Sequence, residues 1–228
     1  MMKTFTRWVA ALLMGFIAIT ASASPANPQL GVDYQAVPAP QDAEAGKQVE
    51  IIEFFGYFCP HCYSLDTPIT NWARQHKDKV LLRRVHVKFN DSMNVQQRMF
   101  YTLAAMGELT NSFHHKVFKA MQEDRFPFKS DVQVFRWMEE NGIDRAKFEE
   151  MYRSPYVDAL CAQSIDMMNA FKLDGVPMLI VDGKYMTSLA IVSDGNKADM
   201  SEMEAVNATV KVLDNLVNRT LKERNTKK

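Results

Sequence analysis

A buried strand that runs directly into a helix carrying two closely spaced cysteines constrains this chain more than any other feature. Residues 49–55 (VEIIEFF) are short, β-branched and aromatic, which predicts a strand covered on both faces. Cys59 and Cys62 follow, and Leu65 and Ile69 then continue with helical spacing. We therefore expect Cys59 at the N-terminus of a helix and Cys62 one turn further in.

The segments after this helix alternate between sheet and helix patterns. Residues 80–89 end in a strand-like alternation, which completes a βαβ unit. Residues 94–172 carry apolar residues at helical spacing, and Ser154-Pro155 is a helix start with proline in the first turn. Residues 178–187 return to a strand pattern around the hairpin turn Asp182-Gly183, and an amphipathic helix closes the chain. The expected fold class is therefore α/β, with β-rich ends that enclose an all-helical insert.

The first residues have the pattern of a secretory signal. Lys3 and Arg7 precede an apolar run over residues 8–20, and Ala21-Ser22-Ala23 is a small-residue cleavage site. The run is shorter than the ~20 apolar residues that a membrane-spanning helix needs. Cleavage near Ala23 leaves 205 of the 228 residues with a net charge near −2, because the 27 basic residues lose two and the 27 acidic residues lose none. This balance gives no indication of a nucleic-acid partner.

Three roles are open to Cys59 and Cys62: metal binding, a structural disulfide or thiol exchange. Zinc would need two more ligands at matching spacing, and the chain offers only Cys161 and five scattered histidines. A disulfide across so short a loop removes little chain entropy and stabilises the fold weakly. A helix N-terminus, by contrast, offers free N–H groups and a positive potential to a thiolate. The pattern therefore favours thiol exchange.

The combination of motifs resembles a known family. GYFCPHCY after IIEFF, a later Val176-Pro177 before a strand, and a helical block between them resemble the thioredoxin superfamily and, more closely, the DsbA family of periplasmic thiol:disulfide oxidoreductases. The resemblance covers essentially all of the chain after the signal. It implies a thioredoxin-like domain made of residues 24–91 and 167–228, with residues 92–166 as a helical insertion domain. It also implies an oxidised resting state that donates its disulfide to exported proteins.

The resemblance assigns roles within the Cys-Pro-His-Cys motif. Cys59 is expected to be the exposed sulfur that forms and leaves the mixed disulfide, and Cys62 the buried partner that resolves it. Pro60 and His61 lie between them. His61 can donate a hydrogen bond or a positive charge to the Cys59 thiolate, which makes the disulfide a stronger oxidant. The alternative is that His61 is an ordinary surface histidine.

Further residues are expected beside the cysteines. The family places a buried acid at the position of Glu53, where burial raises the carboxyl pKa and suits it to accept the proton of Cys62. The alternative is a strand-edge glutamate that faces solvent or pairs with Arg83 or Arg84. The resemblance also implies a cis Val176-Pro177 bond near the active site. Because proline cannot donate an N–H, an extended substrate can add there as a strand.

The remaining expectations concern the third cysteine and the partners. Cys161 lies on an apolar helical stripe and is expected to be an inert core thiol. We expect the Cys59–Cys62 disulfide to be the redox-active group, with no separate cofactor and no metal ion. Expected partners are reduced exported proteins and a quinone-linked membrane protein of DsbB type that restores the disulfide. The chain is expected to be monomeric and periplasmic.

Two other functions remain open. One is a disulfide isomerase or reductase on the same fold, which needs the cysteine pair kept reduced. Familiar periplasmic isomerases carry a dimerisation domain before the catalytic domain, and only 35 residues separate Ala23 from Cys59, too few for such a domain. The other is a non-enzymatic metal carrier that uses Cys59, His61 and Cys62.

Overall fold

A mixed five-stranded sheet forms the centre of the computed structural model, which describes residues 27–41, 46–196 and 199–226. The strand order is β1-β5-β4-β2-β3; β2 and β3 run parallel, and the other neighbours run antiparallel. β2 is thus a central strand, and all seven of its residues are buried. The strands are β1 (Gln35–Ala36), β2 (Val49–Phe55), β3 (Val80–His86), β4 (Met178–Val181) and β5 (Tyr185–Thr187).

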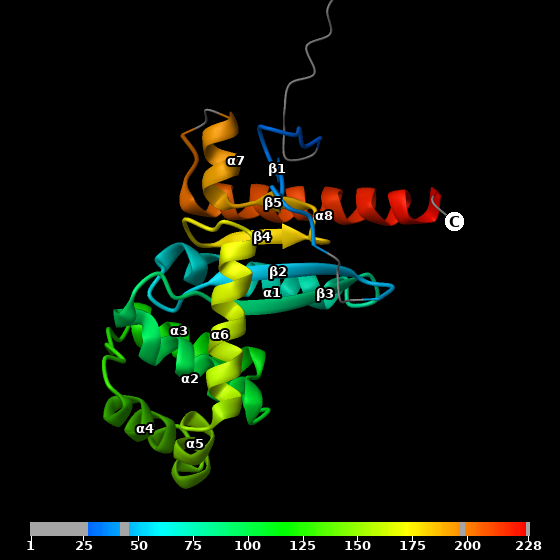
Figure 1. Ribbon diagram of the computed structural model, residues 1–228. Coiled ribbons are helices and arrows are strands. Elements are labelled where there is room, and N and C mark those ends of the chain that lie inside the picture. The colour runs from blue at the N-terminus through cyan, green and yellow to red at the C-terminus, as the bar shows by residue number, and fades with distance from the viewer. Residues whose placement is uncertain (1–26, 42–45, 197–198, 227–228) are drawn as a thin grey trace, which may run out of the picture.

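Helices cover both faces of this sheet (Figure 1). Alternate side chains of β2 point to opposite faces and enter different cores. Ile51 packs in the core shared with α1 (Pro60–Gln75), α7 (Leu189–Asn196) and α8 (Glu202–Thr226). Ile52 packs in the core that receives Met168 from the end of α6 (Pro155–Ala170).

The remaining helices form a block beyond one end of the sheet, at the bottom of Figure 1. The core of this block also contains Phe55, Cys59 and Cys62, so it packs directly against the end of β2 and the start of α1. α6 joins the two parts as one unbroken helix: Val157 packs in the block, and Met168 packs on the sheet. The block comprises η1 (Asp91–Met93), α2 (Asn94–Ala105), α3 (Asn111–Gln122), α4 (Asp131–Glu140), α5 (Arg145–Tyr152) and the first part of α6.

Local signals account for many of these elements. Ser154 caps α6 by accepting the Val157 N–H, and Pro155 follows in the first turn, as the sequence predicts. The turn between β4 and β5 has positive φ at Asp182 and Gly183 (54° and 64°), and the Lys184 N–H closes it on the Val181 carbonyl at 3.0 Å. The predicted strand over residues 49–55, the helix after it and the helical block are all confirmed.

Three features of the fold differ from the sequence prediction or go beyond it. The strand expected over residues 80–89 ends at His86, because the Lys88 N–H turns out of the sheet and bonds the Met168 sulfur. β1 and α7 were not indicated by any pattern.

The predicted signal, residues 1–23, lies outside the described residues. Within the part of the chain that the structure describes, no helix is both long and apolar enough to cross a membrane.

Candidate active site

The N-terminus of α1 brings Cys59 and Cys62 together. Cys59 is the N-cap residue, and its sulfur accepts a hydrogen bond from the backbone N–H of Cys62 at 3.3 Å. Pro60 occupies the first turn, where a missing N–H breaks no helical bond. The turn before the helix is tight: a Cβ at Gly56 would lie 2.2 Å from the Phe58 ring. Sequence and local geometry therefore place one sulfur at the helix end and the other within the first turn.

The two thiols differ in acidity. The hydrogen bond from the Cys62 thiol lowers the pKa of Cys59 to about 7, burial opposes this shift, and the positive charge of His61 adds a smaller lowering. Burial raises the pKa of Cys62 well above its ordinary value. As pH rises above about 7, the pair therefore holds one thiolate, on Cys59, while Cys62 keeps its proton.

His61 pairs with the start of α8. Its Nδ1 lies 2.9 Å from both carboxylate oxygens of Glu202, and the two side chains are 59% and 40% exposed. The hydrogen bond to Glu202 raises the pKa of His61, and the charge of Cys59 raises this pKa further. The charged form of His61 is thus favoured near Cys59, while its hydrogen bond goes to Glu202.

A buried ionic cluster lies between the sheet and α1. Glu53 on β2 is fully buried, and its Oε2 lies 2.9 Å from Nε of Arg84 on β3. Arg84 also reaches Asp66 on α1, with an Nη2–Oδ1 distance of 3.3 Å. Burial raises the pKa of Glu53, although Arg84 opposes the shift. Because the charge of Glu53 also contributes to raising the pKa of Cys62, this carboxyl lies within electrostatic reach of the inner thiol.

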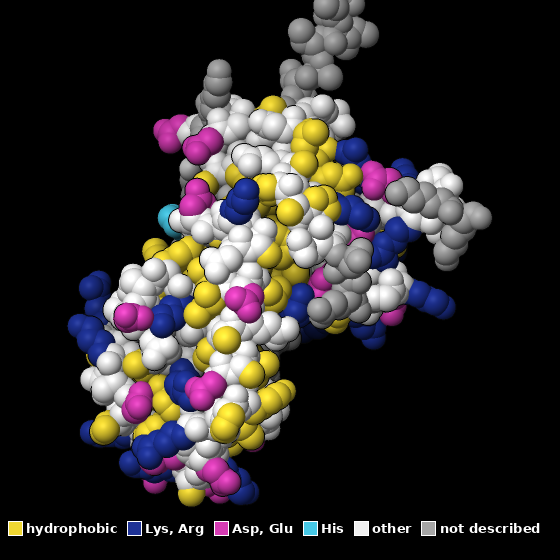
Figure 2. All heavy atoms as spheres, in the orientation of Figure 1, with side chains coloured by type: hydrophobic (Ala, Val, Ile, Leu, Met, Phe, Trp, Pro, Cys, Tyr) yellow, Lys and Arg dark blue, Asp and Glu magenta, His cyan; other side chains and the backbone are white. Residues whose placement is uncertain are grey.

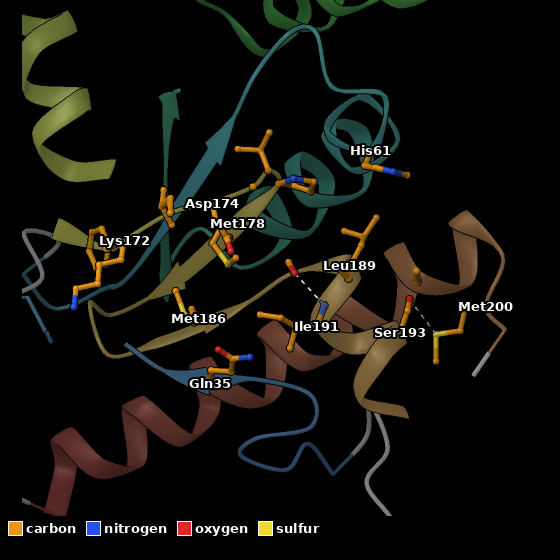
Figure 3. Close-up of a pocket in the computed structure, with 18 of the residues that line it drawn as sticks. Gln35, His61, Lys172, Asp174, Met178, Met186, Leu189, Ile191, Ser193 and Met200 are labelled. Atoms are coloured by element: carbon orange, nitrogen blue, oxygen red, sulfur yellow. Dashed lines mark hydrogen bonds between the residues drawn. The ribbon is translucent and has the colours of Figure 1, made fainter. Parts of the chain in front are cut away.

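A pocket of about 550 Å³ opens beside the cysteines (Figure 3). Val176-Pro177 lines it with a cis peptide bond, and the Val176 carbonyl oxygen lies 3.4 Å from Sγ of Cys59. Figure 2 shows hydrophobic side chains gathered in the middle of one face, around the upper part of α6 and the neighbouring strands. The apolar lining of the pocket includes Phe171, Met178, Met186, Leu189 and Ile191.

Known proteins are similar to this sequence over most of its length. Residues 50–203 match the family described as DSBA-like thioredoxin domain. The chain belongs to the DsbA-like thioredoxin family. The thiol:disulfide interchange protein DsbA of Bordetella pertussis is 32% identical over 185 residues, which cover 81% of this chain and 87% of the relative. DsbA of Burkholderia cepacia is 32% identical over 208 residues, which cover 90% of this chain and 92% of the relative.

Solved structures agree with this assignment. Pseudomonas aeruginosa DsbA, at 24% identity, shares the fold with a TM-score of 0.75 over 88% of this chain and 97% of its own. Reduced DsbA1 from Neisseria meningitidis, at 26% identity, matches with a TM-score of 0.68 over 85% of this chain and 95% of its own. The chain is therefore a thiol:disulfide oxidoreductase with a thioredoxin fold and inserted helices.

The DsbA fold brings all the sequence-predicted site residues into one region. Pro60 and His61 lie at the start of α1 with the two cysteines, and Val176-Pro177 lies against Cys59. One expectation was wrong: Cys59 is only 5% exposed, against 0% for Cys62. The carbonyl of Val176 and the partly buried Phe58 pack around the cysteine and reduce its exposure.

The buried acid combines both interpretations of Glu53. It is fully buried on a central strand, not at an edge, and it also pairs with Arg84. Asp66 was not predicted, although an acid directly beside the apolar positions of α1 was a usable signal. Glu202 was not predicted either, and no local signal could have found it, because it lies 141 residues from His61.

Cys161 lies in the helical block, away from the active-site pair. It is 8% exposed, and burial raises its pKa to about 11. Such a thiol is largely protonated at neutral pH and so is a poor nucleophile. Among the described residues, no group of three or more His, Cys, Asp and Glu side chains is placed to hold a metal ion.

Proposed function

We propose that this chain oxidises cysteine pairs in exported proteins by donating the Cys59–Cys62 disulfide. The observation that carries the proposal is the asymmetry of the pair. The pKa of Cys59 falls to about 7, while burial raises that of Cys62. A sulfur that is stable as a thiolate is a good leaving group, so the mixed disulfide on Cys59 breaks readily in favour of the substrate disulfide.

The exchange proceeds in two steps. A substrate thiolate attacks Sγ of Cys59, the Cys59–Cys62 bond breaks, and Cys62 leaves and takes up a proton. A second substrate thiolate then attacks the substrate sulfur of the mixed disulfide, and Cys59 leaves as a thiolate. The substrate loses two electrons and gains a disulfide, while the cysteine pair of the enzyme gains both electrons.

Glu53 serves the return reaction. When a partner restores the disulfide, Cys62 must lose its proton before its sulfur can attack Cys59. The buried Glu53 carboxyl has a raised pKa, and its Oε1 has no hydrogen-bond partner among the residues described. The Glu53 carboxyl, within electrostatic reach of the inner thiol, is therefore suited to take that proton.

The pocket beside Val176-Pro177 provides the substrate surface. Pro177 has no N–H, and Val176 brings its carbonyl to Cys59, so an extended segment can lie along this edge with its cysteine at the sulfur. The apolar lining of the pocket suits hydrophobic side chains of an unfolded client.

The family and the sequence pattern support a proposal for the setting. A thiol:disulfide interchange protein exchanges its own disulfide with the thiols of other molecules, so it needs reduced substrates and a partner that restores the disulfide. We assign a periplasmic location, cleavage near Ala23, a quinone-linked DsbB-type reoxidant, a monomeric state and the domain division at residues 91/92 and 166/167.

The test is the equilibrium of the Cys59–Cys62 couple against glutathione. The reduction potential of a DsbA couple is about −120 mV, and that of thioredoxin is about −270 mV. We expect a value close to the former, and a value near that of thioredoxin would contradict disulfide donation and favour a reductase. Native mass spectrometry with and without a chelator separates the metal carrier, which binds a metal at the cysteines, from the enzyme.

A further inference from the structure

The pair between His61 and Glu202 joins two helix starts that are far apart in sequence. His61 stands in the first turn of α1, and Glu202 is the first residue of α8. Both carboxylate oxygens lie 2.9 Å from His61 Nδ1. Both residues line the pocket beside the cysteines, and Figure 3 shows the His61 side chain pointing away from the middle of that pocket.

The neighbouring carboxylate of α8 is engaged elsewhere. Glu204 accepts hydrogen bonds from the backbone N–H and the hydroxyl of Ser201, at 2.9 and 2.6 Å, and so caps its own helix. Glu202 is therefore the acid of this first turn that reaches α1. Glu202 and Glu204 are thus neighbouring carboxylates with different contacts, so a substitution of Glu204 is a matched control for one of Glu202.

The charged and titratable groups around His61 come from three elements. Glu202 faces it from α8, and Cys59 and Cys62 stand beside it at the start of α1. The loop before β4 contributes Lys172 and Asp174 to the same pocket. Of these, Glu202 is the group whose carboxylate contacts the ring, so it has the largest influence on the imidazolium.

The charge of His61 affects the redox equilibrium on one side only. Oxidised protein and two glutathione molecules give dithiol protein and glutathione disulfide, with two electrons passing to the Cys59–Cys62 pair. Only the dithiol protein carries the Cys59 thiolate, so a nearby positive charge stabilises that side and makes the disulfide more oxidising. A histidine without a partner loses its charge above a pKa of about 6.5 and would lose this effect.

We propose that Glu202 is a positioning residue for disulfide donation: by holding the His61 imidazolium at the mouth of the active site, it preserves the oxidising strength of the Cys59–Cys62 couple as pH rises through neutrality. The proposal rests on the proposed function, because it assigns a regulator to the same couple. It adds a residue from the opposite end of the chain to the site.

The experiment compares Glu202→Gln with wild type and with the matched control Glu204→Gln in the full mature chain. Two quantities are measured: the midpoint of the His61 imidazole titration by NMR, and the glutathione equilibrium constant at about pH 5.5 and about pH 8, on either side of the ordinary histidine pKa of about 6.5. We expect Glu202→Gln to lower the His61 midpoint. At the higher pH it should weaken the oxidant by about two- to fivefold, the range for an exposed ion pair.

At the lower pH, where His61 is charged in both proteins, Glu202→Gln should leave the equilibrium unchanged or slightly more oxidising. Glu204→Gln should change neither quantity, and Glu202→Asp should restore part of the midpoint. In a His61→Gln background, Glu202→Gln should have no effect on the equilibrium.

An unchanged His61 midpoint, an equal loss at both pH values, or a loss that persists in the His61→Gln background would each overturn the proposal. The proposed function fails separately. If the wild-type couple were no more oxidising than thioredoxin, disulfide donation would be wrong, while the His61 midpoint would still test the pairing.

Discussion

Two groups of charged residues flank the first turns of α1, and they differ in their contact with water. The outer pair, His61 and Glu202, is 59% and 40% exposed. The inner cluster, Glu53, Arg84 and Asp66, is 0%, 11% and 3% exposed. Attraction between charges is weak in water and much stronger in the interior, where a charge left without its partner is costly. The outer pair can therefore adjust the chemistry of Cys59 with little effect on the fold, whereas the inner cluster is part of the fold.

The sharpest contrast is between the outer sulfur and the inner one. Cys59→Ser should abolish oxidation of a reduced exported client without trapping any adduct, because only Cys59 forms the mixed disulfide. Cys62→Ser, loaded with glutathione on Cys59 by glutathione disulfide, should accumulate protein–client adducts: the client thiolate displaces glutathione, and the thiol that would release the client is lost. Non-reducing gels detect the adducts, and recovered client activity measures turnover.

Cys161→Ser is the matched control for these two variants. It replaces a buried thiol of the helical block and should leave turnover unchanged. A loss as large as that of Cys59→Ser would contradict the inert-core interpretation and require a relay of three thiols.

Stability should separate the two charged groups. Arg84→Met leaves Glu53 buried without its cation and removes one partner of Asp66, so it should destabilise the fold by about 3–5 kcal/mol. Glu202→Gln should cost less than about 1 kcal/mol, as for an exposed pair. Denaturant unfolding of the oxidised proteins measures both changes, and similar losses would remove the distinction between the outer pair and the inner cluster.

The buried histidines and the exposed His61 should change the pH dependence of folding stability in opposite directions. Burial lowers the pKa of His86 to about 3 and also lowers that of His114. Below the unfolded value of about 6.5 the unfolded chain binds protons that these folded histidines do not, so each lowers stability by up to about 1.4 kcal/mol per pH unit. His61, with a raised pKa, contributes stability below 6.5 that is lost as pH rises through its folded value.

Unfolding free energies measured across this pH range test the contrast. His114→Gln should make the loss of stability below pH 6.5 shallower, because the pKa of His114 is lowered in the folded chain. His61→Gln should act above pH 6.5 instead, where it removes the gain of stability that accompanies protonation of His61 as pH falls toward 6.5. Parallel changes in the two variants would show that their environments do not differ in this way.

The last contrast is between the two redox states. The folded pKa of Cys59 is about 7 against an ordinary 9.0, so between these values the unfolded dithiol chain binds a proton that the folded chain does not. The reduced protein should therefore gain stability relative to the oxidised protein from pH 7 to pH 9, by at most about 1.4 kcal/mol per pH unit. Thermal melts of both forms at several pH values measure the gain; a difference that does not grow over this interval would contradict the acidity assigned to Cys59.

The sequence by itself determined the features that depend on neighbouring residues. The apolar run over residues 49–55 is a buried strand, and the helix begins beside Cys59 with Pro60 in its first turn. These features were predictable because strand alternation, helix capping and turn formation act over a few residues. The chemistry of the cysteine pair followed from the same short stretch.

Only the tertiary structure decided which distant groups meet. Arg84 could have faced solvent, but the parallel pairing of β2 and β3 sets it opposite Glu53. Glu202 reaches His61 only because α8 folds back over the face of the sheet that α1 covers. Packing likewise places Val176 over Cys59 and reduces its exposure to 5%. Burial and electrostatic interactions depend on contacts between residues that are far apart in the sequence. No local sequence pattern encodes these contacts.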